Sequence, residues 1–179
     1  MITDGIANNK LLAFTPVSYS DDLIPATPLN LISGKSGSFN MLRGSNDLYT
    51  WISNAPATIN LQSSAGLIYG DRGPAKFELF PIAETGGNSV AKGEAAPDKQ
   101  PHQVQLKSTF DGLQRIHISD GSAGTSVDWP AGMPMVMESS MDDAPTLAGG
   151  RWTMYFYVPK GTKIIGGYRS AVGTLKSPD

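Results

Sequence analysis

The sequence predicts an all-β protein, an antiparallel two-sheet β-sandwich of the jelly-roll type. Three observations lead to this fold class. The chain of 179 residues contains 20 glycines and 13 prolines, and both residue types disfavour helices. Short segments in which apolar and polar residues alternate recur along the chain, as in strands with one buried face. Long segments with the apolar spacing of an amphipathic helix are missing. A closed barrel is the alternative architecture.

Residues 1–35 are expected to form an extended N-terminal segment or linker that packs on the sandwich. Pro16, Pro25 and Pro28 interrupt this segment, and each lacks the N–H group that a strand ladder requires. The glycine- and serine-rich loop at 33–38 leads into the β-sandwich domain, which we expect to cover residues 36–179.

The β-sandwich domain is expected to contain twelve short strands. They are predicted at residues 38–43, 48–53, 57–63, 67–70, 75–82, 88–93, 102–108, 113–119, 125–129, 133–139, 151–158 and 163–170. Alternation is clearest at 57–63, 102–108 and 113–119, where one face is apolar and the other polar. The segment 151–158 is apolar on both faces, so Trp152, Phe156 and Val158 are assigned to the core.

Composition excludes several classes of function. Charged residues make up 17% of the chain, and the formal net charge is -2. Without a basic excess, neither nucleic acid nor a membrane surface is expected as a partner. The chain has no cysteine, which excludes thiol catalysis and a disulfide framework. No apolar run is long enough to span a bilayer.

Catalytic chemistry has little support in the sequence, and we expect a protein that is not an enzyme. The two histidines, His102 and His117, accompany no nucleophile motif, so a catalytic triad is not expected. Asp128 and Glu138 lie on adjacent predicted strands and form a possible carboxylate pair for glycoside hydrolysis. Any β-protein with 16 acidic residues contains such pairs. A small hydrolase or lyase is therefore the third interpretation.

A structural calcium ion is the one cofactor for which the sequence offers ligands. Asp142 and Asp143 provide adjacent carboxylates in a predicted loop, and carboxylate oxygens are the ligands that Ca²⁺ prefers. Their spacing does not match an EF-hand loop. The alternative is that these acidic residues are simply solvated.

Aromatic side chains beside hydrogen-bonding residues point to a sugar-binding surface. A sugar presents a flat C–H face and a rim of hydroxyl groups, which a ring and its polar neighbours can contact together. Such combinations occur on the strand 48–53, at the end of the strand 125–129 and at the end of the strand 163–170. The predicted ligand-binding residues are Tyr49, Trp51, Asp128, Trp129, Tyr168 and Arg169. For each ring, a place in the core is the alternative.

Three segments carry a resemblance to a known family: 112–121 (GLQRIHISDG), 127–130 (VDWP) and 152–162 (WTMYFYVPKGT). They resemble parts of galactose-binding-like β-sandwich domains attached to bacterial secreted polysaccharide-degrading enzymes. The resemblance covers residues 38–179. It implies a non-catalytic ancillary role within a larger protein, outside the cytoplasm or at the cell surface.

These observations favour a carbohydrate-binding module whose partner is a polysaccharide or oligosaccharide. The second hypothesis is a structural or interaction module that docks or spaces a catalytic domain of the same chain through an apolar patch. A partner surface that buries Trp51 or Trp129 would favour docking, whereas an open ring over a shallow groove would favour sugar.

Overall fold

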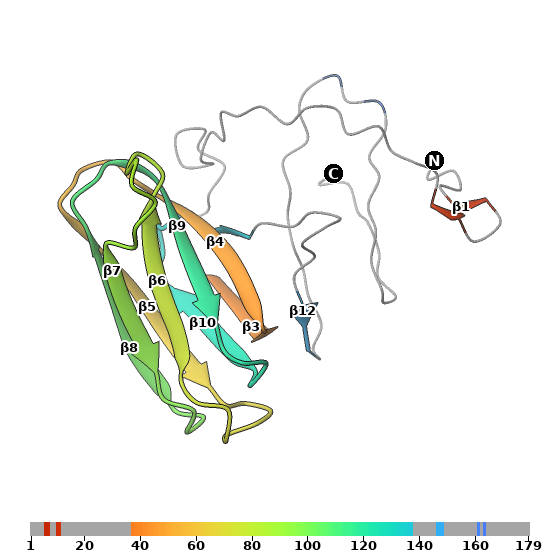
Figure 1. Ribbon diagram of the computed structural model, residues 1–179. Coiled ribbons are helices and arrows are strands. Elements are labelled where there is room, and N and C mark those ends of the chain that lie inside the picture. Colours follow the sequence, from red (N-terminus) through yellow and green to blue (C-terminus); the bar gives the residue numbers. More distant parts are fainter. Residues whose placement is uncertain are drawn as a thin grey trace. The chain divides into compact units, whose positions relative to one another are not determined.

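A computed structural model describes residues 6–7, 10–11, 37–137, 146–148, 161 and 163 (Figure 1). The chain divides into two compact units, Ile24–Arg151 and the combination of Met1–Leu23 with Trp152–Asp179. In the latter unit, β1 (Ile6–Ala7) and β2 (Lys10–Leu11) pair as a two-stranded antiparallel sheet. All other strands belong to the unit Ile24–Arg151.

The unit Ile24–Arg151 is a sandwich of two five-stranded antiparallel sheets, visible in Figure 1 as two layers. We call them sheet I, with the order β12-β3-β10-β5-β8, and sheet II, with the order β11-β4-β9-β6-β7. The strands are β3 (Gly37–Arg43), β4 (Ser45–Ile52), β5 (Ala57–Ala65), β6 (Ala75–Pro81), β7 (Ala91–Ala95), β8 (Pro101–Ser108), β9 (Gly112–Ser119), β10 (Thr125–Trp129), β11 (Val136–Met137) and β12 (Thr146–Leu147). The predicted all-β two-sheet sandwich is confirmed.

The strands pair in a nested order. β3 pairs with β10, β4 with β9, β5 with β8 and β6 with β7, each time antiparallel. The strands β7, β8, β9 and β10 thus pair with β6, β5, β4 and β3 in that order. Meanwhile the chain passes repeatedly from one sheet to the other. This arrangement of eight strands is a jelly roll.

The core lies between the two sheets and follows from period-two alternation. In β5, Ile59 and Leu61 point inward and are at most 2% exposed, whereas Thr58, Asn60 and Gln62 point outward and are exposed. The other central strands show the same alternation, as expected for sheets that bury one face. The core is mostly aliphatic, and Phe77 is its largest fully buried side chain.

The structure differs from the predicted strands in several places. Residues 67–70 form no strand, because the backbone N–H groups of residues 67–69 bond to the carbonyl oxygens of Ala123 and Gly124 in the turn between β9 and β10. β7 begins three residues later than predicted, at Ala91. Of the predicted strand 133–139, only the two residues of β11 form a described strand, and β12 was not predicted.

Other predictions lie outside the described residues. They are the strands 151–158 and 163–170, apart from Lys163, with the core assignments that they carry. The boundary between an N-terminal segment and the sandwich at residues 35 and 36 also lies there. No helix that could cross a membrane occurs in the described part of the chain.

Two passages between the sheets meet at Asp120. The chain crosses from β3 to β4 through the single residue Gly44, which has a φ of 75°, a value that favours glycine. The turn after β9 carries the chain back to sheet I. The Asp120 carboxylate accepts hydrogen bonds from the N–H groups of Gly44 (2.7 Å), Ser122 (2.8 Å) and Gly124 (2.8 Å) and from the Thr125 hydroxyl (2.9 Å). Asp120 is 2% exposed, so water cannot replace these bonds.

We therefore expect Asp120→Ala to lower the free energy of unfolding by about 3 kcal/mol, because it leaves buried donors without an acceptor. Urea denaturation followed by circular dichroism measures the change. Asp111→Ala is the matched control: Asp111 accepts one exposed bond, from the Ala55 N–H group at 2.6 Å, and its loss should cost about 1 kcal/mol or less. Equal losses in the two variants would contradict this role of Asp120.

Candidate functional site

One end of the sandwich is hollowed between two connections that pass from sheet to sheet. Residues 53–56 join β4 to β5, and residues 130–135 join β10 to β11. The hollow, which we call the end pocket, has a volume of about 370 Å³. It is lined by Thr50, Trp51, Ile52, Ser53, Asn54, Ala57, Thr58, Ile59, Pro130, Ala131, Gly132, Met133 and Pro134.

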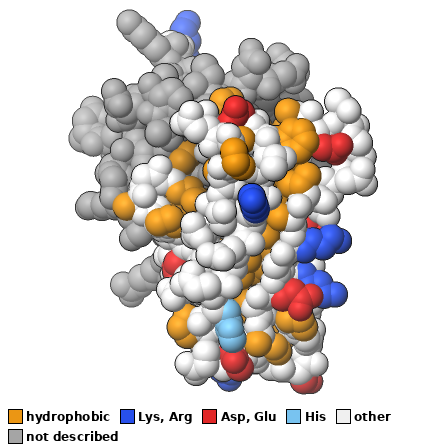
Figure 2. Space-filling model, turned by 90° about the vertical axis from the view of Figure 1, so that its left-hand side faces the viewer, with side chains coloured by type: hydrophobic (Ala, Val, Ile, Leu, Met, Phe, Trp, Pro, Cys, Tyr) orange, Lys and Arg blue, Asp and Glu red, His pale blue; other side chains and the backbone are white. Residues whose placement is uncertain are grey.

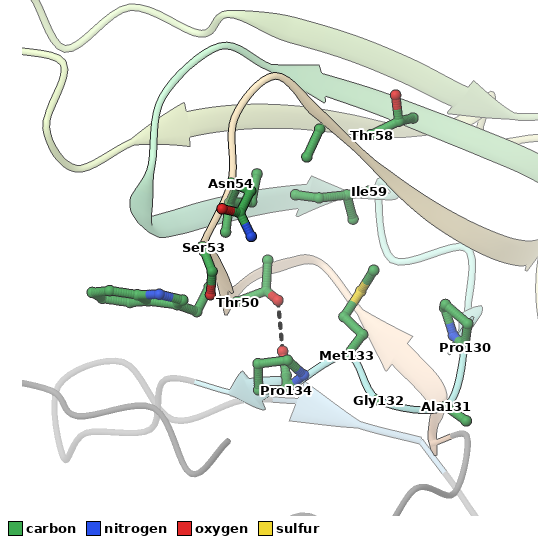
Figure 3. A pocket seen from close by; sticks show the side chains of 13 residues that line it. Thr50, Ser53, Asn54, Thr58, Ile59, Pro130, Ala131, Gly132, Met133 and Pro134 are labelled. Atoms are coloured by element: carbon green, nitrogen blue, oxygen red, sulfur yellow. Dashed lines mark hydrogen bonds between the residues drawn. The ribbon is translucent and has the colours of Figure 1, made fainter. Parts of the chain in front are cut away.

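The second connection is fixed to β4 by a buried hydrogen bond. The Thr50 hydroxyl donates to the carbonyl oxygen of Pro134 at 2.6 Å, and Thr50 is 3% exposed. Beyond Pro134, β11 pairs with β4, with Val136 opposite Tyr49. This anchoring keeps one wall of the end pocket in place. Figure 3 shows Met133 extending from this wall toward Ile59 of β5.

The lining of the end pocket combines apolar and hydrogen-bonding groups without any ionisable side chain. Ser53, Asn54 and Thr58 are exposed, and Figure 3 shows them on the side away from Pro134. The side chains of these three residues form no hydrogen bond within the described part of the chain, although the Thr58 carbonyl oxygen accepts one from Asn60 Nδ2 at 3.3 Å. Trp51 is the one aromatic residue of the lining. The end pocket thus offers free donors and acceptors in a neutral setting.

Trp51 and Tyr49 lie on the outward face of β4. Both are half-buried, and they alternate with the buried Leu48, Thr50 and Ile52. Trp51 belongs to the lining of the end pocket, whereas Tyr49 does not.

Trp129 and Asp128 are neighbours in sequence but point to opposite faces of β10, because side chains alternate along a strand. Trp129 packs against the core: its ring centroid lies 5.0 Å from that of Phe39. A Cβ atom on Gly37 would lie 2.4 Å from the Trp129 ring, so only glycine permits this contact. Asp128 is exposed on the outer face of sheet I, opposite Gln62.

Asp128 lies on β10, and its predicted partner Glu138 follows β11 in the sequence. β10 belongs to sheet I and β11 to sheet II, so the two strands predicted to be adjacent lie in different layers. Glu138 itself lies outside the described residues. Partial burial raises the pKa of the Asp128 carboxyl above its ordinary value.

Four predicted site residues, Tyr168, Arg169, Asp142 and Asp143, lie outside the described residues. No group of three or more His, Cys, Asp or Glu suited to a metal ion occurs in the described part of the chain.

Both histidines form hydrogen bonds with aspartates. His102 Nε2 lies 2.8 Å from Asp98 Oδ1, and His117 Nδ1 lies 2.8 Å from Asp47 Oδ1. The hydrogen bond from His102 is the main reason that the pKa of Asp98 is lowered.

For the rest of the lining, the signals in the sequence are weak. Ser53 and Asn54 follow Trp51 with only Ile52 between them, so their polar character was visible near the predicted ring. Met133, Met135 and Met137 recur at every second position, which is typical of one face of a strand that packs into the core, and nothing local places Met133 against residues 53–58. To predict that Met133 lies near residues 53–58, one must know which connections cross between the sheets.

Comparison with models of known protein families gives no match, and no curated protein matches the chain.

The packing of the two tryptophans predicts different effects on stability. Trp129→Ala should lower the free energy of unfolding by about 3 kcal/mol, because it opens a cavity beside Phe39 and Gly37. Trp51→Ala, on the outward face, should cost about 1 kcal/mol or less. Urea denaturation of both variants measures the difference, and an equal cost would contradict the contrast in packing.

The raised pKa of Asp128 predicts a pH-dependent effect on stability. The folded state holds the Asp128 proton more tightly than the unfolded state. At pH values above the ordinary pKa of this group, ionisation of the carboxyl therefore destabilises the fold. This destabilisation disappears as the pH falls below the ordinary pKa. Asp128→Asn should therefore be slightly more stable than the wild type at pH 7, by about 0.5 kcal/mol or less since the group is exposed. The difference should vanish near pH 3. Urea denaturation at both pH values tests this, and a destabilised variant at pH 7 would contradict it.

Proposed function

We propose that this protein is a non-catalytic carbohydrate-binding module, an ancillary domain of a larger secreted bacterial protein, and that it binds a neutral glycan in the end pocket. The observation that carries the proposal is the composition of the lining. A tryptophan and uncommitted amide and hydroxyl groups surround a hollow without ionisable side chains.

Each part of the lining has a counterpart in a sugar. The Trp51 ring offers an apolar surface for the C–H face of a pyranose. Asn54 both donates and accepts hydrogen bonds, and the hydroxyls of Ser53 and Thr58 do the same, as the hydroxyl rim of a sugar requires. A charged ligand would find no opposite charge in the lining.

The size of the end pocket supports a small contact. Its volume of about 370 Å³ falls at the lower end of ligand pockets. Small polar interfaces of this kind give dissociation constants in the micromolar to millimolar range. The proposed secretion and bacterial origin rest on the resemblance of residues 38–179 to domains of secreted enzymes.

Affinity gel electrophoresis with a panel of neutral polysaccharides, followed by calorimetry with the best ligand, tests the proposal. Trp51→Ala should weaken binding by about tenfold or more through the loss of stacking. Asn54→Ala should weaken it by about three- to tenfold through the loss of hydrogen bonds.

Tyr69→Ala is the control variant for the glycan test. Tyr69 is 41% exposed and lies beyond the far end of β5, since β5 runs from Ala57 at the end pocket to Ala65. Its ring contacts Arg72, whose Cζ lies 4.2 Å from the ring centroid. This variant should bind like the wild type. Unchanged affinity in both pocket variants would reject the site, and absence of binding to every polysaccharide would reject the function.

The alternative is an interaction module, and one observation favours it. The outward face of sheet II carries aromatic and apolar side chains, including Phe80 and Ile82, the latter 55% exposed. Aromatic and arginine side chains are typical of protein interfaces. Binding to a protein surface that is lost in Phe80→Ala and retained in Asn54→Ala would favour this function over glycan binding.

A further inference from the structure

The outward face of sheet II carries one row of charged residues across four neighbouring strands. Asp47 of β4 lies opposite His117 of β9, His117 opposite Glu78 of β6, and Glu78 opposite Lys92 of β7. The row therefore reads acidic, imidazole, acidic, basic. Figure 2 views the molecule from the β7 and β8 side, and charged side chains gather on the sheet II flank, whereas the sheet I flank is mostly neutral.

Contacts within the row hold these side chains in place. His117 Nδ1 lies 2.8 Å from Asp47 Oδ1, and Lys92 Nζ lies 2.5 Å from Glu78 Oε1. The hydrogen bond from Lys92 is the main reason that the pKa of Glu78 is lowered. The Lys92 side chain is 69% exposed and the Glu78 and His117 side chains are each 33% exposed, so they remain accessible from outside.

Two further rows lie beside the charged one, toward the end pocket. In the first, Arg115 of β9 lies opposite Phe80 of β6, with its Cζ 4.5 Å from the ring centroid. In the next, the Ile82 N–H group bonds to the Leu113 carbonyl oxygen at 2.9 Å, which places these two apolar residues side by side. Tyr49 of β4 continues the first of these rows opposite Arg115, and Trp51 continues the next opposite Leu113. The rows thus change from charged to aromatic and apolar along the strands.

This pattern complements itself under a two-fold rotation. The rotation axis lies in the plane of the face, parallel to the strands and midway between β9 and β6. Rotation by 180° about this axis brings β9 of one copy over β6 of the other copy, and β4 of one copy over β7 of the other. Each row then meets the same row in reversed order. Asp47 faces Lys92 of the second copy, and His117 faces Glu78 of the second copy, so every pair in the charged row joins groups that attract.

The same rotation matches the other two rows. Arg115 faces the Phe80 ring of the second copy, which adds a cation–π contact to the one that each copy already has. Leu113 faces Ile82 of the second copy, so the aliphatic groups cover each other. A symmetric contact in which one patch meets itself is the commonest arrangement of homodimers.

We propose that the outward face of sheet II binds a second copy of this chain about that two-fold axis. The proposal does not rest on glycan binding, but Trp51 lies on this same face, opposite Leu113, so a second copy and a glycan stacked on the Trp51 ring would compete for it. The face spans five strands and eight residues, which is roughly 500 Å² per copy. A total near 1,000 Å² lies at the lower bound of specific interfaces, so the dimer forms reversibly and depends on concentration.

Sedimentation velocity of the full chain over a wide concentration range tests the proposal. The wild type should shift from its monomer mass of 19.0 kDa toward twice that mass as concentration rises. Lys92→Glu places two like charges opposite each other at both symmetry-related contacts and should weaken the dimer by about tenfold or more. The control Lys107→Glu makes the same charge change on the outer face of sheet I and should dimerise like the wild type.

A mixing experiment separates the proposed geometry from a general effect of charge. Asp47→Lys alone should also weaken dimerisation. An equimolar mixture of Asp47→Lys and Lys92→Glu should form heterodimers, because both contacts then join opposite charges. If Asp47→Lys fails to fold, Ile82→Asp at an exposed position replaces it as a second disruptive variant. Any of three results would overturn the proposal. The wild type could stay monomeric at every concentration, Lys92→Glu could dimerise as well as the wild type, or the mixture of folded Asp47→Lys and folded Lys92→Glu could stay monomeric.

Discussion

A single buried carboxylate holds together the two places where this chain changes sheets. The Asp120 side chain accepts bonds from Gly44, at the crossing from β3 to β4, and from Ser122, Gly124 and Thr125, at the crossing from β9 to β10. Because β3 pairs with β10 and β4 with β9, one anion fixes the relation between the two sheets at this end. Nothing else among the described side chains gathers as many bonds.

The opposite end of the sandwich is held differently, and the difference bears on the proposed glycan site. There each connection has one separate bond: the Thr50 hydroxyl donates to the Pro134 carbonyl oxygen, and the Ala55 N–H group donates to the Asp111 carboxylate. The exposed side chains of Ser53 and Asn54 keep their hydrogen-bonding capacity. The fold thus gathers four bonds on one buried carboxylate at one end and leaves uncommitted side chains at the other. Such a division between a rigid scaffold and exposed loops is common in binding proteins.

Much of the fold could be predicted from the sequence because burial repeats every two residues. Segments such as Thr58–Gln62 and Gln103–Lys107 alternate cleanly, so their strands and inward faces were evident. The strand predicted at residues 67–70 was wrong, because Leu67 and Ile68 are apolar for a different reason. Their loop packs on the turn at 123–124. The predicted strand 133–139 contains β11, but the short length of β11 and the existence of β12 depend on pairing with β4 and β3, which no local pattern reveals.

The candidate site was less predictable, because it depends on which strands become neighbours. Trp51 was recognised by its polar sequence neighbours, but its partners at 130–134 come from the other half of the jelly roll. Trp129 showed the same local signal, yet it packs on Gly37 and Phe39.

The nested pairing also has a consequence for the order in which the chain can fold. Leu79 and Ala91 of the innermost pair are close in sequence, whereas Gly37 and Trp129 of the outermost pair are separated by most of the unit. Closing a long loop costs more chain entropy than closing a short one. The β6–β7 hairpin is therefore the natural nucleus, and each pair that forms around it shortens the loop for the next. Topologies dominated by such distant pairings fold slowly, on the scale of milliseconds to seconds.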